Sequence, residues 1–184
     1  MTAARVIAID CSPSGGGRTR RVLEAVLDAC REQGAVGDLI EVGSSADVDA
    51  AVEAISALGL RDGLVLGTPI YRATYAFPMK ALLDSIPRDS ETGDGPLRAR
   101  VAGIVATGAS LHHFLGLGEL REVLSVFFAA IVVPPGLYVP REGFADDGLT
   151  TPYATAASTL GGAVVELAAV VAGSAHLSRL APQA

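Results

Sequence analysis

Short apolar runs alternate with helix-periodic segments along the whole chain. The runs are rich in β-branched residues and predict five buried strands, over 5–10, 37–42, 63–69, 100–108 and 130–140. The segments that follow repeat apolar residues every three or four positions and predict helices over about 19–33, 46–58, 76–86, 118–129 and 152–172. Such an alternation indicates an α/β fold with a parallel sheet covered on both faces.

The number of strands narrows the architecture further. Five strands in 184 residues favour a single domain over residues 1–184, a flavodoxin-like doubly wound sheet with strand order 2-1-3-4-5. The fifth strand is interrupted by the double proline Pro134-Pro135. In sheets of this type ligands bind beyond the carboxyl ends of the strands, at the switch point between strands one and three. We therefore look for chemistry in the loops that follow strands one, three and four.

The last predicted helix has no clean polar face. Its stretch 154–173 is mostly Ala, Gly and Val, but Ser158, Thr159 and Glu166 interrupt it, which disfavours a membrane span. A helix that is apolar nearly all round must be covered on more than one side. We therefore expect a second subunit to cover it, in a dimer or a larger assembly.

Composition excludes several classes of protein. Half of the residues are hydrophobic and 18% are charged, which argues against disorder. The net charge of −6 argues against a nucleic-acid binder, because phosphate backbones require a basic face. Cys11 and Cys30 show no metal-binding or redox spacing and fit a reducing, cytoplasmic location. We expect Cys11 to be a small buried residue rather than a reactive thiol.

The loop after the first strand, within "DCSPSGGGRTRRVLEAVL" (10–27), has the composition of an anion site. Successive glycine amides at a helix start form a nest for a phosphate. Hydroxyl and guanidinium donors accompany them: Ser12, Ser14, Arg18, Thr19 and Arg20. The loop is neither a Walker A motif nor a G-x-G-x-x-G fingerprint. The alternative is an ordinary strand-to-helix turn with Thr19 as the N-cap.

Two further loops carry candidate residues. After the third strand, "GTPIYRATYAFPMKALLDSIP" (67–87) places Pro69 at the strand end, where it removes a donor and would leave neighbouring amides free for a planar polar ligand. After the fourth strand, "ATGASLHHFLG" (106–116) contains the turn Thr107-Gly108 and His113, which could face a ligand or simply pack or cap. His112 and His113 face different ways on a helix, so no metal site is expected.

These stretches resemble the NAD(P)H-dependent FMN reductases of flavodoxin-like fold. The likeness runs through "CSPSGGGRTRRVL", "GTPIYRATYAFPMKALLDSIP", "ATGASLHHFLGLGELREVLSVFFAA" and "GFADDG". Within the family, the stretches resemble more particularly the flavin reductase components of two-component monooxygenases, including the alkanesulfonate type. The second stretch is the most specific. The resemblance implies hydride transfer from NADPH or NADH to FMN, with no side chain needed as acid or base.

The resemblance also implies roles for individual residues. The FMN phosphate would lie on Ser12, Ser14, Arg18 and Thr19, with Arg20 in support. The flavin ring would rest against Pro69, Ile70, Tyr71, Arg72 and Ala73, and its other edge against Thr107, Gly108 and Ala109, with His113 at the family's histidine position. Members form dimers or tetramers with the flavin near a subunit interface. Asp146 and Asp147, in "FADD", would belong to a loop near that interface rather than to a catalytic pair.

The chain departs from the family pattern at two places. Ser14 stands where many relatives have Arg. The region of Gly118 and Glu119 is one residue shorter than in alkanesulfonate-type reductases, whose fourth helix contains a π-turn at the tetramer interface. The shorter region predicts an uninterrupted helix here, a feature of relatives that retain FMN tightly.

Several functions stay open at the level of sequence. Reduced FMN could pass to a monooxygenase partner, or a tightly bound FMN could reduce a quinone, azo or nitro compound in a ping-pong cycle. A flavodoxin-type electron carrier and a flavin-free scaffold are the other readings. The absence of Trp and the basic phosphate loop disfavour the carrier.

Overall fold

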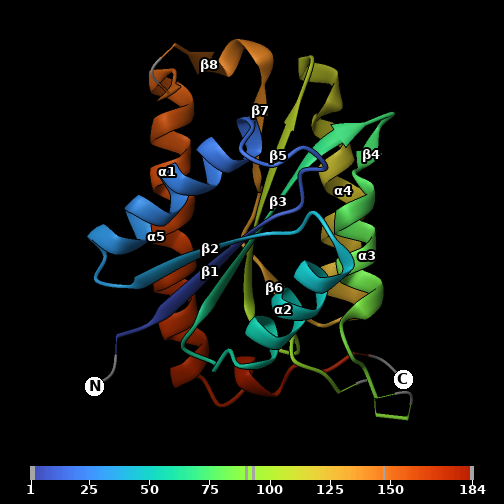
Figure 1. Cartoon of the computed structure of the whole chain (residues 1–184). Helices are drawn as coiled ribbons and strands as arrows, with labels where there is room; N and C mark the ends of the chain where they lie inside the picture. Colours follow the sequence, from blue (N-terminus) through green and yellow to red (C-terminus); the bar gives the residue numbers. More distant parts are fainter. Residues whose placement is uncertain (1–2, 90, 93, 147, 183–184) are drawn as a thin grey trace.

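A mostly parallel sheet runs through the middle of the molecule, with helices on both faces (Figure 1). The computed structural model describes residues 3–89, 91–92, 94–146 and 148–182. The main strand order is β2-β1-β3-β5-β6. These strands are β1 (Arg5–Asp10), β2 (Val36–Glu41), β3 (Gly63–Tyr71), β5 (Val101–Gly108) and β6 (Ile131–Val132). All four pairings along this order are parallel, so the carboxyl ends of the strands meet at one edge.

The predicted flavodoxin-like fold is confirmed, and the main path of the sheet follows the predicted order, but further strands pair beside that path and the predicted number of strands is wrong. Within the described residues the sheet has seven strands instead of five. The predicted fifth strand is split by the double proline into β6 and β7 (Leu137–Pro140), and both pair with β5. The other additional strand is β4 (Thr74–Tyr75), which forms an antiparallel hairpin with β3. A separate hairpin joins β8 (Phe144–Ala145) to β9 (Gly148–Leu149).

Two layers of helices cover the sheet (Figure 1). On one face α1 (Arg18–Glu32) and α5 (Thr151–Gly173) pack on Val6 and Ala8 of β1. On the other face α2 (Ser45–Ser56), α3 (Phe77–Ser85) and α4 (Leu117–Glu122) share one hydrophobic core with Ile7 and Ile9 of β1. Successive side chains of a strand point to opposite faces, and β1 is buried on both, which explains why it is apolar at every position from Val6 to Ile9.

The fourth predicted helix is not one continuous α-helix. The segment consists of a 3-10 helix η1 (Leu111–Gly116), the short α4, and a π-helical turn η2 (Val123–Phe127). In that turn the amide of Phe128 donates to the carbonyl of Val123, at 3.2 Å. The expectation of an uninterrupted helix is therefore wrong. The π-turn lies closer to the C-terminus than the Gly118–Glu119 region that suggested continuity.

Helix α5 packs closely against α1. A Cβ atom at Gly161 would lie 2.5 Å from the carbonyl oxygen of Val26 and 2.8 Å from the Cβ of Ala29, so only glycine fits. By length and composition α5 is the one helix among the described residues that could cross a membrane, and 33% of its most apolar window is buried in the structure. Its buried residues form part of the core beside α1 and the sheet.

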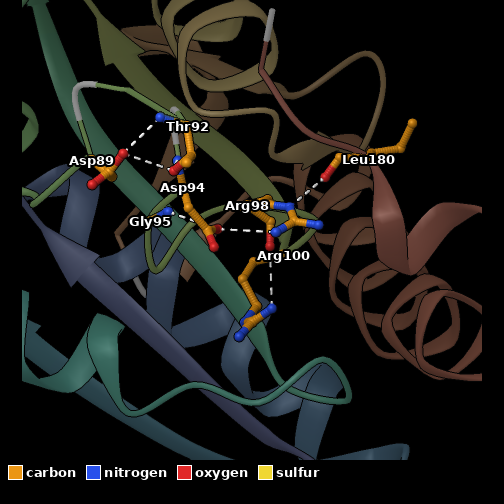
Figure 2. Close-up of polar contacts among 7 residues, drawn as sticks. All are labelled: Asp89, Thr92, Asp94, Gly95, Arg98, Arg100 and Leu180. Carbon is orange, nitrogen blue, oxygen red and sulfur yellow. Dashed lines mark hydrogen bonds and ion pairs between the residues drawn. The ribbon is translucent and has the colours of Figure 1, made fainter. Parts of the chain in front are cut away.

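A polar network fixes the loop after α3 at the far end of the sheet from the carboxyl ends of β3 and β5 (Figures 1 and 2). The Asp89 carboxylate accepts from the amide and the hydroxyl of Thr92, at 2.6 and 2.8 Å. Arg98 donates to Asp94 at 3.2 Å and to the carbonyl of Leu180 at 3.0 Å. Through Arg98 this region is thus tied to the C-terminal segment.

Candidate functional site

The loop between β1 and α1 is shaped by glycine. Gly15 and Gly16 have φ angles of 58° and 59°, in the left-handed region that glycine adopts without strain. Gly17 is the N-cap of α1 and has no side chain to cap the helix, so the first amides of α1 are available to another acceptor. The interpretation of Thr19 as the N-cap is wrong. Thr19 is the second residue of the helix, and it is buried.

The end of β3 differs from the expectation. Pro69 does not end the strand, because β3 continues to Tyr71 and folds back through β4. The turn consists of Arg72 and Ala73, which have φ angles of 51° and 70°. These are the left-handed angles of a tight hairpin turn, which usually contains Asn or Gly. The hairpin extends β3 beyond the sheet and places Tyr71 and Arg72 at an exposed rim.

The end of β5 is joined to the first loop by a buried contact. The hydroxyl oxygens of Thr19 and Thr107 lie 2.9 Å apart. The adjacent Gly108 is tightly surrounded: a Cβ there would meet the Tyr138 hydroxyl, and would lie 3.1 Å from His113 Nδ1. His113 is half-buried on η1, and its Nδ1 is buried without a hydrogen-bond partner among the described residues.

The three strand ends meet at one cavity of about 550 Å³. This volume lies within the usual range of small-molecule sites. The lining comprises Ser12, Ser14, Gly17, Arg18, Thr19, Pro69, Ile70, Tyr71, Arg72, Thr107, Gly108, Ala109 and His113. Sequence analysis predicted all of these except Gly17. Its position as the last glycine before the predicted helix is the sequence signal that could have identified it. The second and third loops, which follow the first by about fifty and ninety residues in the sequence, thus line the same cavity as the first.

Two predicted residues do not line the cavity. Arg20 donates through Nη1 to Glu41 at 2.7 Å and through Nε to Glu24 at 2.8 Å. Glu41 also accepts from the amide of Gly16 at 3.1 Å. These donors keep the pKa of Glu41 below its ordinary value, chiefly through the Gly16 amide. Ala73 lies in the hairpin turn beyond the rim of the cavity.

The charges at the cavity are positive. Arg18 and Arg72 are the ionised side chains in its lining, and no carboxylate is among the lining residues. The guanidinium of Arg18 lies 5.5 Å from the ring centre of Phe144 in β8, a cation–π contact that sequence analysis did not foresee. This local excess of positive charge on a chain of net charge −6 suits an anionic ligand.

The thiol and carboxylate candidates take no part in this lining. Cys11 is fully buried, and burial raises the pKa of its thiol far above the ordinary value, so it is not an activated nucleophile. Asp146 lines a different pocket together with residues of α1, and Asp147 lies outside the described residues. Within the described residues, no group of three or more His, Cys, Asp or Glu side chains is placed to hold a metal ion.

Comparison with known families agrees with this geometry. The profile of the family described as NADPH-dependent FMN reductase matches residues 4–143, which contain all three loops. The chain belongs to this family. A curated member from Pseudomonas putida, the NADH-dependent FMN reductase SfnF, is 34% identical over 116 residues, covering 63% of this chain and 58% of that protein. The chain spans little more than half the length of that relative.

Other members of the FMN reductase family match over different lengths. SfnE of Pseudomonas putida, also named an NADH-dependent FMN reductase, is 29% identical over 157 residues, covering 79% of this chain and 81% of that protein. FMN reductase (NADPH) of Escherichia coli is 32% identical over 93 residues, covering 50% of this chain and 42% of that protein.

Solved structures support the fold. The apo form of an NADH:FMN oxidoreductase, EMOB, superposes with a TM-score of 0.74 at 25% identity, covering 98% of this chain and 95% of that one. An archaeal flavodoxin superposes with a TM-score of 0.60 at 14% identity, covering 90% and 99%, which shows the flavodoxin-like fold alone.

Proposed function

We propose that this protein is an NAD(P)H-dependent FMN reductase that binds FMN in the cavity at the carboxyl ends of β1, β3 and β5. The proposal depends on one observation: in a chain of this family, the glycine-rich loop and the two strand ends line the same cavity. The lining suits FMN, because one end offers hydroxyls, helix amides and Arg18, while the other offers Pro69 and Ile70.

The residues of this chain would bind and orient the two nucleotides. Ser14, the N-terminal amides of α1 and Arg18 would hold the phosphate, and Arg20 is not part of that group. The segments 69–72 and 107–109 would hold the ring and exclude water from one side of it. FMN supplies the redox chemistry, since it accepts a hydride from reduced nicotinamide and passes the electrons on. The exposed Tyr71 and Arg72 leave an open rim for NADPH or NADH.

We also propose how the reduced flavin is used. Tight retention of FMN was expected from an uninterrupted fourth helix, and the π-turn at Val123–Phe127 removes that reason. We therefore favour reduced FMN that leaves the protein for a monooxygenase or another acceptor. A cytoplasmic location is supported by the two free, buried cysteines.

Purified protein tests the proposed activity directly. Oxidation of NADPH and of NADH is followed with and without added FMN, and we expect FMN-dependent turnover of about 1–1,000 per second with at least one of them. Protein freed of FMN should show little oxidation, and adding menadione separates a quinone reductase from a flavin reductase. An electron carrier would bind FMN without oxidising the nicotinamide. A scaffold would show no FMN-induced rise in melting temperature.

A further inference from the structure

Ser12 lies in the cavity wall, but both of its donors are directed at Asp10. The Ser12 amide donates to Asp10 Oδ1 at 3.0 Å, and the Ser12 hydroxyl donates to the same oxygen at 2.5 Å. Both residues are buried. A serine hydroxyl has a single proton to donate. While Asp10 accepts it, Ser12 cannot donate to a phosphate in the cavity.

Asp10 is itself in an unfavourable place for a negative charge. Its residue is 1% exposed, and its second oxygen, Oδ2, is buried without a hydrogen-bond partner among the described residues. Burial raises the pKa of Asp10 above its ordinary value, although the two donations from Ser12 oppose the shift. An orphaned carboxylate oxygen of this kind is costly, and a proton on the carboxyl group removes most of that cost.

The charged groups around Asp10 come from each neighbouring element. On β2, Glu41 is the register partner of Asp10, and its charge raises the pKa of Asp10 further. On α1, Arg20 lowers that pKa, but Arg20 is already paired with Glu41. On β3, the register partner of Asp10 is Gly67, which has no side chain. Cys11, which follows Asp10 in the chain, carries no charge, because burial raises the pKa of its thiol. A phosphate dianion bound on the adjacent loop would be a further negative charge near Asp10 and, like Glu41, would raise its pKa.

Protonation of Asp10 changes what Ser12 can do. A carboxyl O–H can donate to Ser12 Oγ across the 2.5 Å contact, and the serine proton is then free to turn toward the cavity. One proton is taken from solvent, one buried charge disappears, and one more donor becomes available to an anion. The exchange concerns protons and hydrogen bonds only.

We propose that Asp10 is a positioning residue for the flavin phosphate, taking up a proton as the phosphate binds and so turning the Ser12 hydroxyl toward it. This inference rests on the proposed function, because it requires FMN in the cavity. It goes beyond that function by making FMN affinity depend on a buried carboxyl group that does not itself line the cavity.

The test compares the dissociation constants of FMN and riboflavin from pH 5 to 9, measured by flavin fluorescence, for the wild type and Asp10→Asn. Asparagine removes the charge, and its amide nitrogen in the place of Oδ1 can donate to Ser12 Oγ as the protonated carboxyl group would, although the Ser12 amide then loses its acceptor. We expect the ratio of the wild-type to the Asp10→Asn constant for FMN to be near one at the acid end and to rise to about tenfold or more at the alkaline end. Titration of the FMN phosphate itself cancels in this ratio.

Two controls separate positioning from simple charge removal. Riboflavin has no phosphate, so its ratio should stay near one at every pH. In a Ser12→Ala background, Asp10→Asn should improve FMN binding by less than about threefold, because the Ser12 hydroxyl that would turn toward the phosphate is absent. A ratio for FMN that is flat with pH or below one overturns the inference. The inference is also overturned if Asp10→Asn improves FMN binding as much in the Ser12→Ala background as in the wild type, or if the ratio for riboflavin rises with pH as much as the ratio for FMN.

A second measurement covers the case in which Asp10→Asn does not fold. Calorimetry of the wild type at pH 7.5 in two buffers of different ionisation enthalpy should show net proton uptake with FMN, whose phosphate is then already a dianion, and none with riboflavin. No uptake with FMN overturns the inference. Failure of the wild type to bind either flavin at any pH would instead overturn the proposed function, so the two failures are distinguishable.

Discussion

Individual residues of one loop have different tasks, although their side chains are similar in kind. Arg18 lines the cavity and Arg20, two positions later, is bound to Glu24 and Glu41 on the outer side of α1. Sequence reasoning could identify the loop, because glycines and hydroxyls after a buried strand indicate an anion nest. It could not separate the two arginines, because the partner of Arg20 comes from β2, twenty-one residues away.

This difference predicts unequal effects of two matched substitutions. Arg18→Ala should weaken FMN binding about tenfold or more, because a charge-assisted contact with the phosphate is lost. Arg20→Ala should change it by less than about threefold. Dissociation constants from flavin fluorescence measure both, with riboflavin as the ligand that should distinguish neither variant from the wild type. Equal losses for the two variants would mean that Arg20 reaches the phosphate and that this arrangement of the loop is wrong.

At the scale of elements, the sequence predicted the long strands and helices and missed the short ones. Periodicity was sufficient for β1, β3, β5, α1 and α5, because each buries a regular face. The β3–β4 hairpin was missed, because its turn is Arg72-Ala73 instead of a glycine-containing pair. The π-turn was missed as well, because one extra residue in a helical turn leaves little trace in an apolar pattern.

The close contact between α1 and α5 predicts opposite effects at two adjacent glycines. Gly161→Ala should lower the free energy of unfolding by about 1–3 kcal/mol, because the new methyl group would collide with the backbone of α1. Gly162→Ala meets nothing within 4 Å and should leave stability unchanged or raise it by up to about 1 kcal/mol. Urea unfolding followed by circular dichroism measures both. A destabilising Gly162→Ala would show that this side of α5 is also covered.

On the scale of the whole molecule, the large exposed apolar side chains identify where a second copy would bind. On α5 the large apolar side chain that is exposed is that of Val170. This helix therefore offers less apolar surface than its sequence suggested. The exposed apolar side chains instead gather on the segment of η1, α4 and η2, which we call the 111–127 segment. They are Leu111, Phe114, Leu115, Val126 and Phe127. We propose that a homodimer or homotetramer forms through this segment, beside the cavity.

Light scattering during size-exclusion chromatography tests this proposal against the chain mass of 18.7 kDa. We expect the wild type to run as a dimer or tetramer. Leu115→Lys should shift it toward the monomer, because a charge on a residue that is 71% exposed in the single chain would be buried at the interface. Val36→Lys, on β2 and also exposed, is the matched control and should leave the mass unchanged. A monomeric wild type, or dissociation by Val36→Lys alone, contradicts the proposal.

The predicted fifth strand is divided into β6 and β7, and this division affects how copies of the chain can associate. An open strand edge invites another chain to add a strand to the sheet. Here that edge consists of β6 and β7, and between them stand Pro134 and Pro135, which have no backbone N–H to offer to an incoming strand. The same prolines that divide the predicted fifth strand thus oppose the addition of strands from other copies at this edge, so self-association is left to the helices.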